Sequence, residues 1–539
     1  MTLRARRLIV AGLVLLSLAA YAGVLGNRFT NWDDEHLIVK NTAIRSLDPL
    51  PLLRSYHLSY PPLTVFTHCL DYSFWGLNPV GYHVTDLLLY ALIVATFFLL
   101  AQRITGDARA ACAAAALFAV HPLHVESVAW LSSRKDGAAM ACYLAAFLAY
   151  IRTRRAHLNV PSGSAQDGEG EGRGFVWLSA LLYLGAVWAK PLMITLPLAL
   201  ILYETLLRRK SLPRALRRLL PFAVPLALTA LAAVFLDPQN ETCLPWHGGS
   251  PWATARVVLR VMGDYLRMLV FPVNLNALYL VVIPPRFLDV RCLLPLAAGA
   301  LLVALALKRA RSIPLFSFCV GWGIVSLLPV MQFIPSNVIK ADRYLYLPSA
   351  ALCLLCGAAW ARAARGGRRV SWIAGLAAAV ALLFALTVAR CAVWRDSAAL
   401  WESSVAQNPS NPDARNNLGI AYARARRYDD AAAELGRALS LRPDFPSARN
   451  NLANVYLLTG RYDDALRELE KATGLTRDIV YAANVYITMG IAWEKKGDCA
   501  RALEAYEKAS RLNPSYLDDS VLRARIAGCR KKLAARPGG

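Results

Sequence analysis

The run VTDLLLYALIVATFFLLAQ at residues 84–102 indicates what kind of protein this chain forms. It is long enough to cross the hydrocarbon core of a bilayer as a helix, which takes about 20 apolar residues. Because a bilayer core offers no water to backbone groups, such a run must satisfy them internally. The chain has 539 residues, is 56% hydrophobic, and repeats such runs along much of its length. The sequence therefore predicts an all-α, polytopic membrane protein.

Eleven spans are expected, with boundaries loose by several residues. They lie near 8–25, 84–102, 108–121, 136–151, 174–190, 191–207, 219–236, 292–308, 313–331, 346–362 and 372–391. Basic residues gather in alternate connections, which is the pattern of cytoplasmic loops. This pattern predicts an integral membrane protein with a cytoplasmic N-terminus and a C-terminal region outside the cytoplasm.

Three other segments bear on this topology. The N-terminal run has signal-peptide form. We nevertheless expect an uncleaved span, because the acidic pair Asp33-Asp34 that follows it must be held at the membrane. Residues 156–173 form a Gly/Ser/acidic linker. Charged residues interrupt the apolar pattern of 255–285, so we expect an interfacial or re-entrant helix there; if it spans, the topology after it inverts.

The net charge of +24 has a membrane explanation, since the basic residues lie between apolar runs. No basic stripe is interleaved with aromatic residues, so we expect no nucleic-acid partner.

From residue 395 onward the chain changes to a repeating, polar pattern. Five positions recur at an offset of 34, the tetratricopeptide period. They are Leu418, Tyr422, Tyr428, Asp430 and Ala438, repeated at Leu452, Tyr456, Tyr462, Asp464 and Ala472. A third copy follows two periods and a three-residue insertion later. We expect a membrane domain at 1–393 and a tetratricopeptide α-solenoid at 394–539, with repeats near 412–445, 446–479 and 483–516 and flanking capping helices.

Cys499 and Cys529 both lie in the repeat region. If that region is outside the cytoplasm, they could form a disulfide; two free thiols are the alternative, because connectivity is not readable from spacing.

The polar residues with chemical potential begin with Asp33 and Asp34, directly after the first span. Two structural interpretations are a solvated loop and an N-cap for a helix beginning at Glu35. The functional interpretation is a general base, a metal ligand, or both, because a carboxylate beside a like charge at a membrane surface can have a raised pKa.

A second group of polar residues follows the third span. His121, His124 and Glu126 could suggest a metal site, but Pro122 between the histidines breaks the helix that would place both on one face. A polar turn at the membrane boundary is the alternative. No ligand spacing establishes a metal, so no cofactor is assigned and a divalent ion is left open.

Charged residues at the expected outer ends of spans form a third group. Its members are Arg134, Lys135, Asp136, Lys190, Arg343 and the neighbouring Tyr344. Charges at such positions are costly and usually have partners or ligands, although long cations can also extend to the interface. Several cations on one side suit a lipid phosphate, since Arg and Lys form charge-assisted bonds to its oxygens.

Together these motifs resemble the transmembrane and tetratricopeptide-repeat containing O-mannosyltransferase family and its bacterial relatives. The matching segments are Asn31-Trp32-Asp33-Asp34, Tyr60-Pro61-Pro62, Leu77-Asn78-Pro79, the segment 118–136, Ala189-Lys190-Pro191, Asp342-Arg343-Tyr344 and Trp394-Arg395-Asp396. The resemblance covers nearly the whole chain and is most specific at 118–136. Relatives often carry Asn and His where Asp86 and Tyr90 stand.

The resemblance implies a type-C glycosyltransferase fold and an inverting transfer of a sugar, with mannose expected, from a polyprenyl-phosphate donor to protein Ser or Thr hydroxyls. It implies Asp33 and Asp34 as the catalytic pair. The expected substrate-binding residues are His121, His124, Glu126, Arg134, Lys135, Asp136, Lys190, Arg343 and Tyr344. The repeats would hold the acceptor or a partner protein. The rival hypotheses are a non-catalytic membrane scaffold for a periplasmic assembly and a lipid or solute transporter.

Overall fold

The computed structural model describes residues 2–48, 62–152, 173–236, 245–366, 368–476, 478–515 and 520–534. Within these ranges the regular elements are helices, and no β-strand occurs. The chain divides into two compact units, Met1–Asp396 and Ser397–Gly539. Tyr60, Pro61 and nearly all of the expected linker at 156–173 lie outside the described residues.

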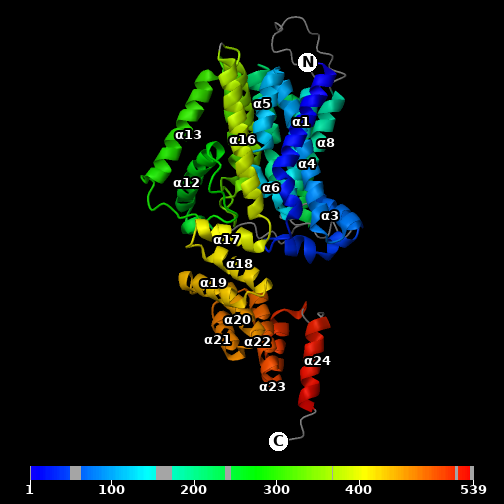
Figure 1. Cartoon of the computed structure of the whole chain (residues 1–539), viewed down its shortest axis with the longest axis vertical. Helices are drawn as coiled ribbons and strands as arrows, with labels where there is room; N and C mark the ends of the chain where they lie inside the picture. Colours follow the sequence, from blue (N-terminus) through cyan, green and yellow to red (C-terminus); the bar gives the residue numbers. More distant parts are fainter. Residues whose placement is uncertain are drawn as a thin grey trace. The chain divides into compact units, whose positions relative to one another are not determined.

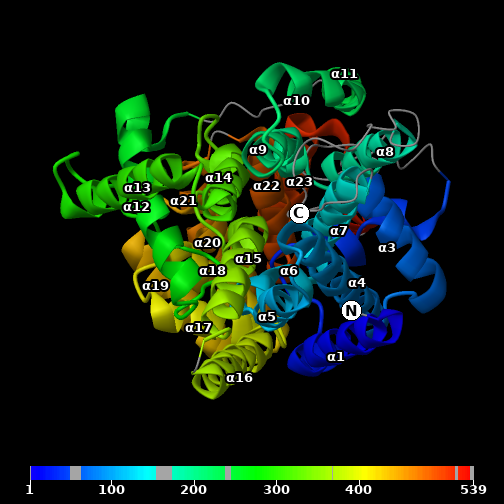
Figure 2. The same ribbon diagram turned by 90° about the horizontal axis from the view of Figure 1, so that it is seen from above.

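The first unit is a bundle of helices, most of which run side by side (Figures 1 and 2). Its α-helices are α1 (Leu3–Tyr21), α3 (Pro62–Trp75), α4 (Pro79–Thr105), α5 (Ala108–Ala119), α6 (Val125–Ala129), α7 (Arg134–Arg152), α8 (Arg173–Ala189), α9 (Leu196–Leu202), α10 (Leu212–Arg218), α11 (Ala223–Leu236), α12 (Pro251–Val270), α13 (Val290–Arg309), α14 (Pro314–Leu327), α15 (Tyr346–Ala363) and α16 (Arg369–Val393). Short helices that matter for the site are η2 (Glu35–Val39), η4 (Pro122–His124), η5 (Leu131–Ser133), η6 (Pro191–Thr195) and η11 (Asp342–Leu345).

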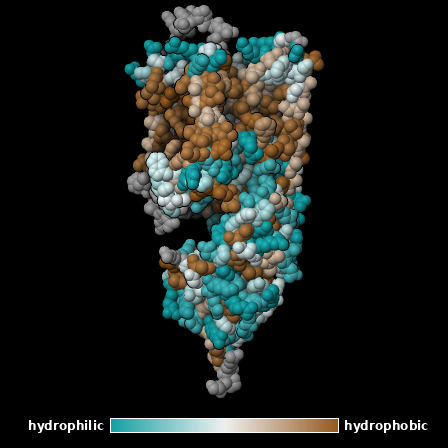
Figure 3. Space-filling model, turned by 90° about the vertical axis from the view of Figure 1, so that its left-hand side faces the viewer, coloured by the Kyte–Doolittle hydropathy of each residue, from teal (hydrophilic) through white to brown (hydrophobic). Residues whose placement is uncertain are grey.

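The apolar helices support an integral membrane protein. Among the described residues, five segments are long and apolar enough to cross a bilayer: Leu3–Gly26, Pro79–Thr105, Val290–Arg309, Asp342–Ala363 and Arg369–Val393. Two bent pairs, Ala108–Ala119 with Pro122–Ala129 and Leu212–Arg218 with Leu220–Ala232, raise this to seven. Figure 3 shows hydrophobic side chains gathered in a broad band over this unit. The other expected spans are helical but shorter, so the number eleven stays a prediction.

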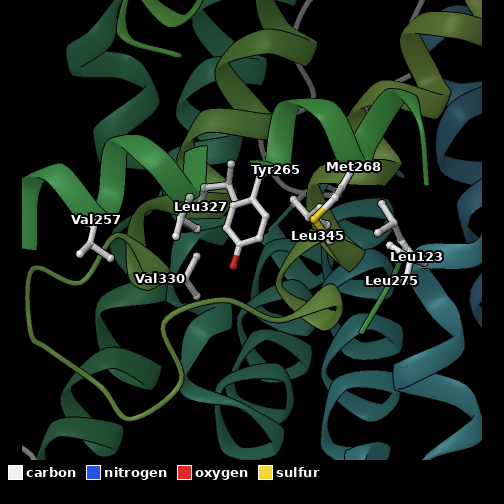
Figure 4. Packing of buried hydrophobic residues seen from close by; sticks show 9 residues of the cluster. Leu123, Val257, Tyr265, Met268, Leu275, Leu327, Val330 and Leu345 are labelled. Atoms are coloured by element: carbon white, nitrogen blue, oxygen red, sulfur yellow. The ribbon is translucent and has the colours of Figure 1, made fainter. Parts of the chain in front are cut away.

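The ambiguous stretch 255–285 contains α12 and then irregular chain. One face of α12 is buried in an apolar cluster with Leu123 of η4 and Leu345 of η11 (Figure 4). The rest of its surface carries exposed Trp252 and Arg267 together with half-buried charged residues. This amphipathic character fits an interfacial helix, and the packing positions η4 and η11, which carry residues of the site below.

The second unit consists of α17 (Ser397–Gln407), α18 (Pro412–Arg424), α19 (Tyr428–Leu441), α20 (Pro446–Leu458), α21 (Tyr462–Thr473), α22 (Ile479–Lys496), α23 (Cys499–Leu512) and α24 (Ser520–Ala534). The expected repeats 412–445 and 446–479 contain α18–α19 and α20–α21, whereas α22 of the third pair begins at Ile479, before the expected bound of 483. Glycines allow the first and third pairs to pack closely: Gly419 lies against Leu435, and Gly490 lies against the ring of Tyr506. Helices α17 and α24 flank the three pairs; their role as capping helices stays a prediction.

Candidate active site

The side chain of Asp34 links the loop after α1 to the segment before α7 by hydrogen bonds. Its Oδ2 accepts hydrogen bonds from the backbone N of Thr30 at 2.8 Å and from the Thr30 hydroxyl at 2.9 Å. Its Oδ1 accepts bonds from the backbone N of Ser132 at 2.9 Å and from the Ser132 hydroxyl at 2.5 Å. Burial raises the pKa of Asp34, and these four donors act against that rise. Asp34 precedes η2 but makes no side-chain cap bond, so the N-cap interpretation is wrong for its side chain.

Asp33 is held differently from its neighbour. It is half-buried, and within the described parts of the chain its carboxylate makes no hydrogen bond. Burial raises its pKa, while the charges of Lys135, Arg343 and His36 lower it. The same loop therefore presents one carboxylate that is fully engaged and one that is available for chemistry.

The two histidines have structural partners. His121 caps η4, with its Nδ1 accepting a bond from the backbone N of Leu123 at 3.3 Å. His124 is completely buried; its Nδ1 lies 2.9 Å from the Tyr90 hydroxyl and its Nε2 lies 2.7 Å from the Ser349 hydroxyl. Among the described residues no three His, Cys, Asp or Glu side chains are grouped to hold a metal ion.

Glu126 and Arg343 join α6 to η11. The Arg343 guanidinium donates to Glu126 Oε1, and the Arg343 backbone N donates to Oε2 at 2.9 Å. The guanidinium also lies over the rings of Trp130 and Tyr344, at 5.4 Å from each centroid. Arg343 is thereby held in one orientation while its charge reaches Asp33.

Lys190 and Asp136 form a second buried ion pair, between the break after α8 and the start of α7. Asp136 also accepts a bond from the Ser133 hydroxyl at 2.7 Å. Lys190 lies 5.7 Å from the ring centroid of Tyr344, the same ring that Arg343 contacts. The two cations therefore approach one aromatic residue.

Arg134 is the most completely enclosed cation of the group, with 1% of its surface exposed. Its Nε donates to Asp86 at 2.6 Å, and its other nitrogens donate to Asp71 and to the Tyr82 carbonyl at 2.9 Å. These partners link α7 to α3 and α4. Arg134 is thus paired with two carboxylates, so its guanidinium is not free to bind a phosphate.

Lys135 differs from Arg134 in its contacts. It follows Arg134 at the start of α7, yet within the described ranges it makes no hydrogen bond or ion pair. Its charge acts on Asp33. Among the described residues, Lys135 and Asp33 are therefore two interacting charges that form no hydrogen bond or ion pair with other side chains.

A row of tryptophans borders these charges. Trp130 lies 6.3 Å from Trp32 and stacks on Trp394 at 5.8 Å, measured between ring centroids. These three rings come from three of the motifs quoted above, more than 350 residues apart at the extremes. The Arg28 backbone N also donates to the carbonyl of Arg395 at 2.8 Å. The fold brings the separate motifs to one place.

Sequence reasoning missed several partners. Thr30 and Ser132 carried no signal of their own, because a hydroxyl near a carboxylate is recognisable only once the fold is known. Asp71 and Asp86 did carry a signal, since carboxylates beside or inside apolar runs need a cation. Arg134 is the cation that they share.

The fold and these contacts define a polytopic membrane protein that carries tetratricopeptide repeats. Models of the tetratricopeptide repeat match residues 394–439 and 423–483.

Curated relatives are named protein O-mannosyl-transferases. One of Caenorhabditis elegans is 25% identical over 437 residues, which cover 76% of this chain and 59% of the relative. Protein O-mannosyl-transferase TMTC3 of Mus musculus is 27% identical over 450 residues, covering 72% of this chain and 46% of the relative. The matches confirm the resemblance to the transmembrane and tetratricopeptide-repeat containing O-mannosyltransferase family. This chain spans about half the length of these relatives.

Two solved structures are also similar. ArnT from Cupriavidus metallidurans, bound to undecaprenyl phosphate, is 15% identical with a TM-score of 0.42, covering 95% of this chain and 89% of that one. The archaeal oligosaccharyltransferase AglB from Archaeoglobus fulgidus, in complex with an inhibitory peptide and a dolichol-phosphate, is 14% identical with a TM-score of 0.42, covering 91% and 71%.

Proposed function

We propose that this chain is an inverting protein O-glycosyltransferase of the membrane. It moves a sugar, with mannose expected, from a polyprenyl-phosphate donor to Ser or Thr hydroxyls of an acceptor protein at the outer face. The names of the curated relatives support the reaction class. The observation that carries the proposal is the unengaged carboxylate of Asp33 beside the charges of Lys135 and Arg343.

In this mechanism Asp33 takes the proton from the acceptor hydroxyl. The hydroxyl oxygen attacks the anomeric carbon of the sugar from the face opposite the lipid phosphate, and the bond from that carbon to the phosphate oxygen breaks. The carbon inverts, and the phosphate leaves with the lipid and an added negative charge. Positioned cations stabilise such charge most effectively where it develops.

The roles of the surrounding residues follow from their partners. Lys135 and Arg343 are the proposed phosphate-binding cations, and Lys190 supports them through Asp136 and Tyr344. Asp34 and Glu126 are positioning residues, because their oxygens are occupied by Thr30, Ser132 and Arg343. The substrate-binding roles predicted for His121, His124 and Arg134 stay predictions; their partners favour a structural contribution.

The proposed placement follows from the basic loops, which put the N-terminus in the cytoplasm and Asp33 and the repeats outside, in a bacterial inner membrane. Alkaline phosphatase fused after residue 400 should be active, and the same enzyme fused after Arg155 should be silent. The reverse pattern would overturn the placement of Asp33 and the repeats together.

The reaction itself is tested with the purified full chain in lipid, a polyprenyl-phosphate mannose donor and a Ser/Thr-rich acceptor protein. The expected result is a hexose-sized mass increase on the acceptor that requires the donor. A parallel comparison uses outer proteins of cells with and without the gene. Absence of any gene-dependent mass shift on outer proteins would favour the scaffold hypothesis.

The acceptor is proposed to bind the repeats, because stacked helix pairs form an extended concave surface that suits a polypeptide. A chain ending after Asp396 should retain the membrane unit and lose transfer to protein acceptors, while hydrolysis or transfer to a small hydroxyl compound is retained. Equal loss of both activities would contradict this division of roles.

A further inference from the structure

Cys499 and Cys529 lie on the two last helices of the second unit. Cys499 is the first residue of α23 and Cys529 belongs to the final turns of α24. Both are buried, with 5% and 1% of their surfaces exposed. They belong to one apolar cluster together with Ala502, Tyr506 and Leu522.

Both thiols are free in this structure, and they lie on α23 and α24, two helices that pack against each other. Burial, together with a hydrogen bond to the Cys499 thiol, raises the pKa of the Cys529 thiol to about 11. Two isolated buried cysteines would only fill space, as small hydrophobic residues do. A disulfide requires its two cysteines on closely packed segments, and the shared cluster on α23 and α24 provides such packing.

We infer that Cys499 and Cys529 form a disulfide bond that fastens the capping helix α24 to the third repeat. Each thiol loses its proton, one S–S bond forms, and two electrons pass to a protein disulfide oxidant of an oxidising compartment. The inference rests on the proposed outer placement of the repeats, since disulfides persist outside the cytoplasm and are rare within it.

The bond has a structural reason at this place. Among the described helices, α24 packs extensively against α23 alone, and elements with few packing partners open most readily. A crosslink stabilises by reducing the freedom of the unfolded chain, and here it would close the segment between α23 and α24. The same two helices line an open groove of about 730 Å³ whose walls include Arg511, Arg523 and Arg530. Fixing α24 would therefore also fix the shape of this basic groove.

Peptide mapping tests the bond directly. Cells are treated with N-ethylmaleimide before lysis, and the purified full chain is digested with trypsin without reductant. Trypsin releases Cys499 in GDCAR, residues 497–501, and Cys529 in IAGCR, residues 526–530. We expect one crosslinked species, lighter than the two peptides together by two hydrogen atoms. Recovery of both peptides singly modified by maleimide would overturn the inference.

Thermal unfolding of the second unit gives an independent readout. Reductant should lower its midpoint in the parent by at least about 5 °C. It should have no such effect in Cys529→Ser or Cys499→Ser, whose midpoints should already be low. Cys356→Ser is the matched control, because its thiol is exposed and lies in α15 of the first unit. An equal effect of reductant on the parent and on Cys529→Ser would contradict the bond.

These outcomes separate this inference from the proposed function. If the phosphatase fusions place the repeats outside and the thiols are nevertheless free, only the disulfide fails. If the bond is present and no transfer activity is found, the glycosyltransferase proposal fails and the outer placement gains support.

Discussion

The charged side chains of the membrane unit and those of the repeat unit are held in different ways. In the repeats, ion pairs recur with the sequence period: Arg427 pairs with Asp430 at 2.8 Å, and Arg461 pairs with Asp464 at 2.6 Å, 34 residues later. In the membrane unit, Asp34 bonds to Ser132 and Glu126 bonds to Arg343, across 98 and 217 residues. The first kind is local and exposed, and the second kind is buried and joins distant segments.

This difference shows which ion pairs contribute to stability and which charged residues are available for catalysis. Exposed pairs are screened by water and contribute little to stability. A buried charge has no water to replace a lost partner, so removing one member of a buried pair is costly. In the membrane unit buried ion pairs and hydrogen bonds hold Asp34, Glu126, Asp136 and Arg134 in place. Within the described part of the site, Asp33 and Lys135 form no ion pair or hydrogen bond of this kind.

The largest expected effect on stability comes from Arg134. Arg134→Gln would leave Asp71 and Asp86 buried without their cation, which should lower the free energy of unfolding by about 3–5 kcal/mol. Thermal unfolding in lipid or detergent measures this loss. The control Arg461→Ala removes an exposed pair of the repeats and should leave the unfolding midpoint unchanged. Equal effects of the two substitutions would contradict the difference in stability between buried and exposed ion pairs.

A smaller effect is expected from a glycine in the repeats. In Gly490→Ala the added methyl group would overlap the buried ring of Tyr506, and such overpacking costs about 1–3 kcal/mol. Gly436 has open space around its Cβ position in the middle of α19, so Gly436→Ala should be neutral or stabilising. Denaturant unfolding of the two variants distinguishes them. A larger loss in Gly436→Ala would show that the helix pairs do not pack as described.

The smallest expected effect is a shift in pH dependence. Asp33 acts as a base only when ionised, so activity should fall as the pH drops through its pKa, which burial raises above the ordinary value of 3.8. The charge of Lys135 lowers that pKa. Lys135→Gln should therefore move the acidic limb of the pH profile of kcat/KM to higher pH. A shift to lower pH, or none, would separate Lys135 from Asp33.

Much of this arrangement was predictable from the sequence, and the reasons differ by region. The repeats were predictable because their contacts lie within one period, as Tyr422 and Tyr456 illustrate. The helical character of the apolar runs followed from the bilayer, but their number did not, because a bent pair such as α5 and α6 has the composition of one span and the geometry of two segments. The motif residues were recognised, yet their partners were not.

Asp33 and Asp34 show why the site required the fold. Two adjacent, chemically identical residues cannot be ranked by composition or spacing. Their difference arises from Thr30 and Ser132, which bind one carboxylate and leave the other. Likewise, Arg134 and Lys135 are consecutive cations, and only the positions of Asp71 and Asp86 show which of them is already engaged.

The comparison of Asp33→Asn with Asp34→Asn tests the central claim most directly. Glycosyl transfer and thermal unfolding are measured side by side for both purified variants in lipid. Asp33→Asn should lose about 10²- to 10⁴-fold in rate and keep the parent's unfolding midpoint, because an amide cannot accept the proton. Asp34→Asn should unfold at a lower temperature, because its amide nitrogen cannot accept the bonds that a carboxylate oxygen accepts. Parent-like activity in Asp33→Asn would contradict the account.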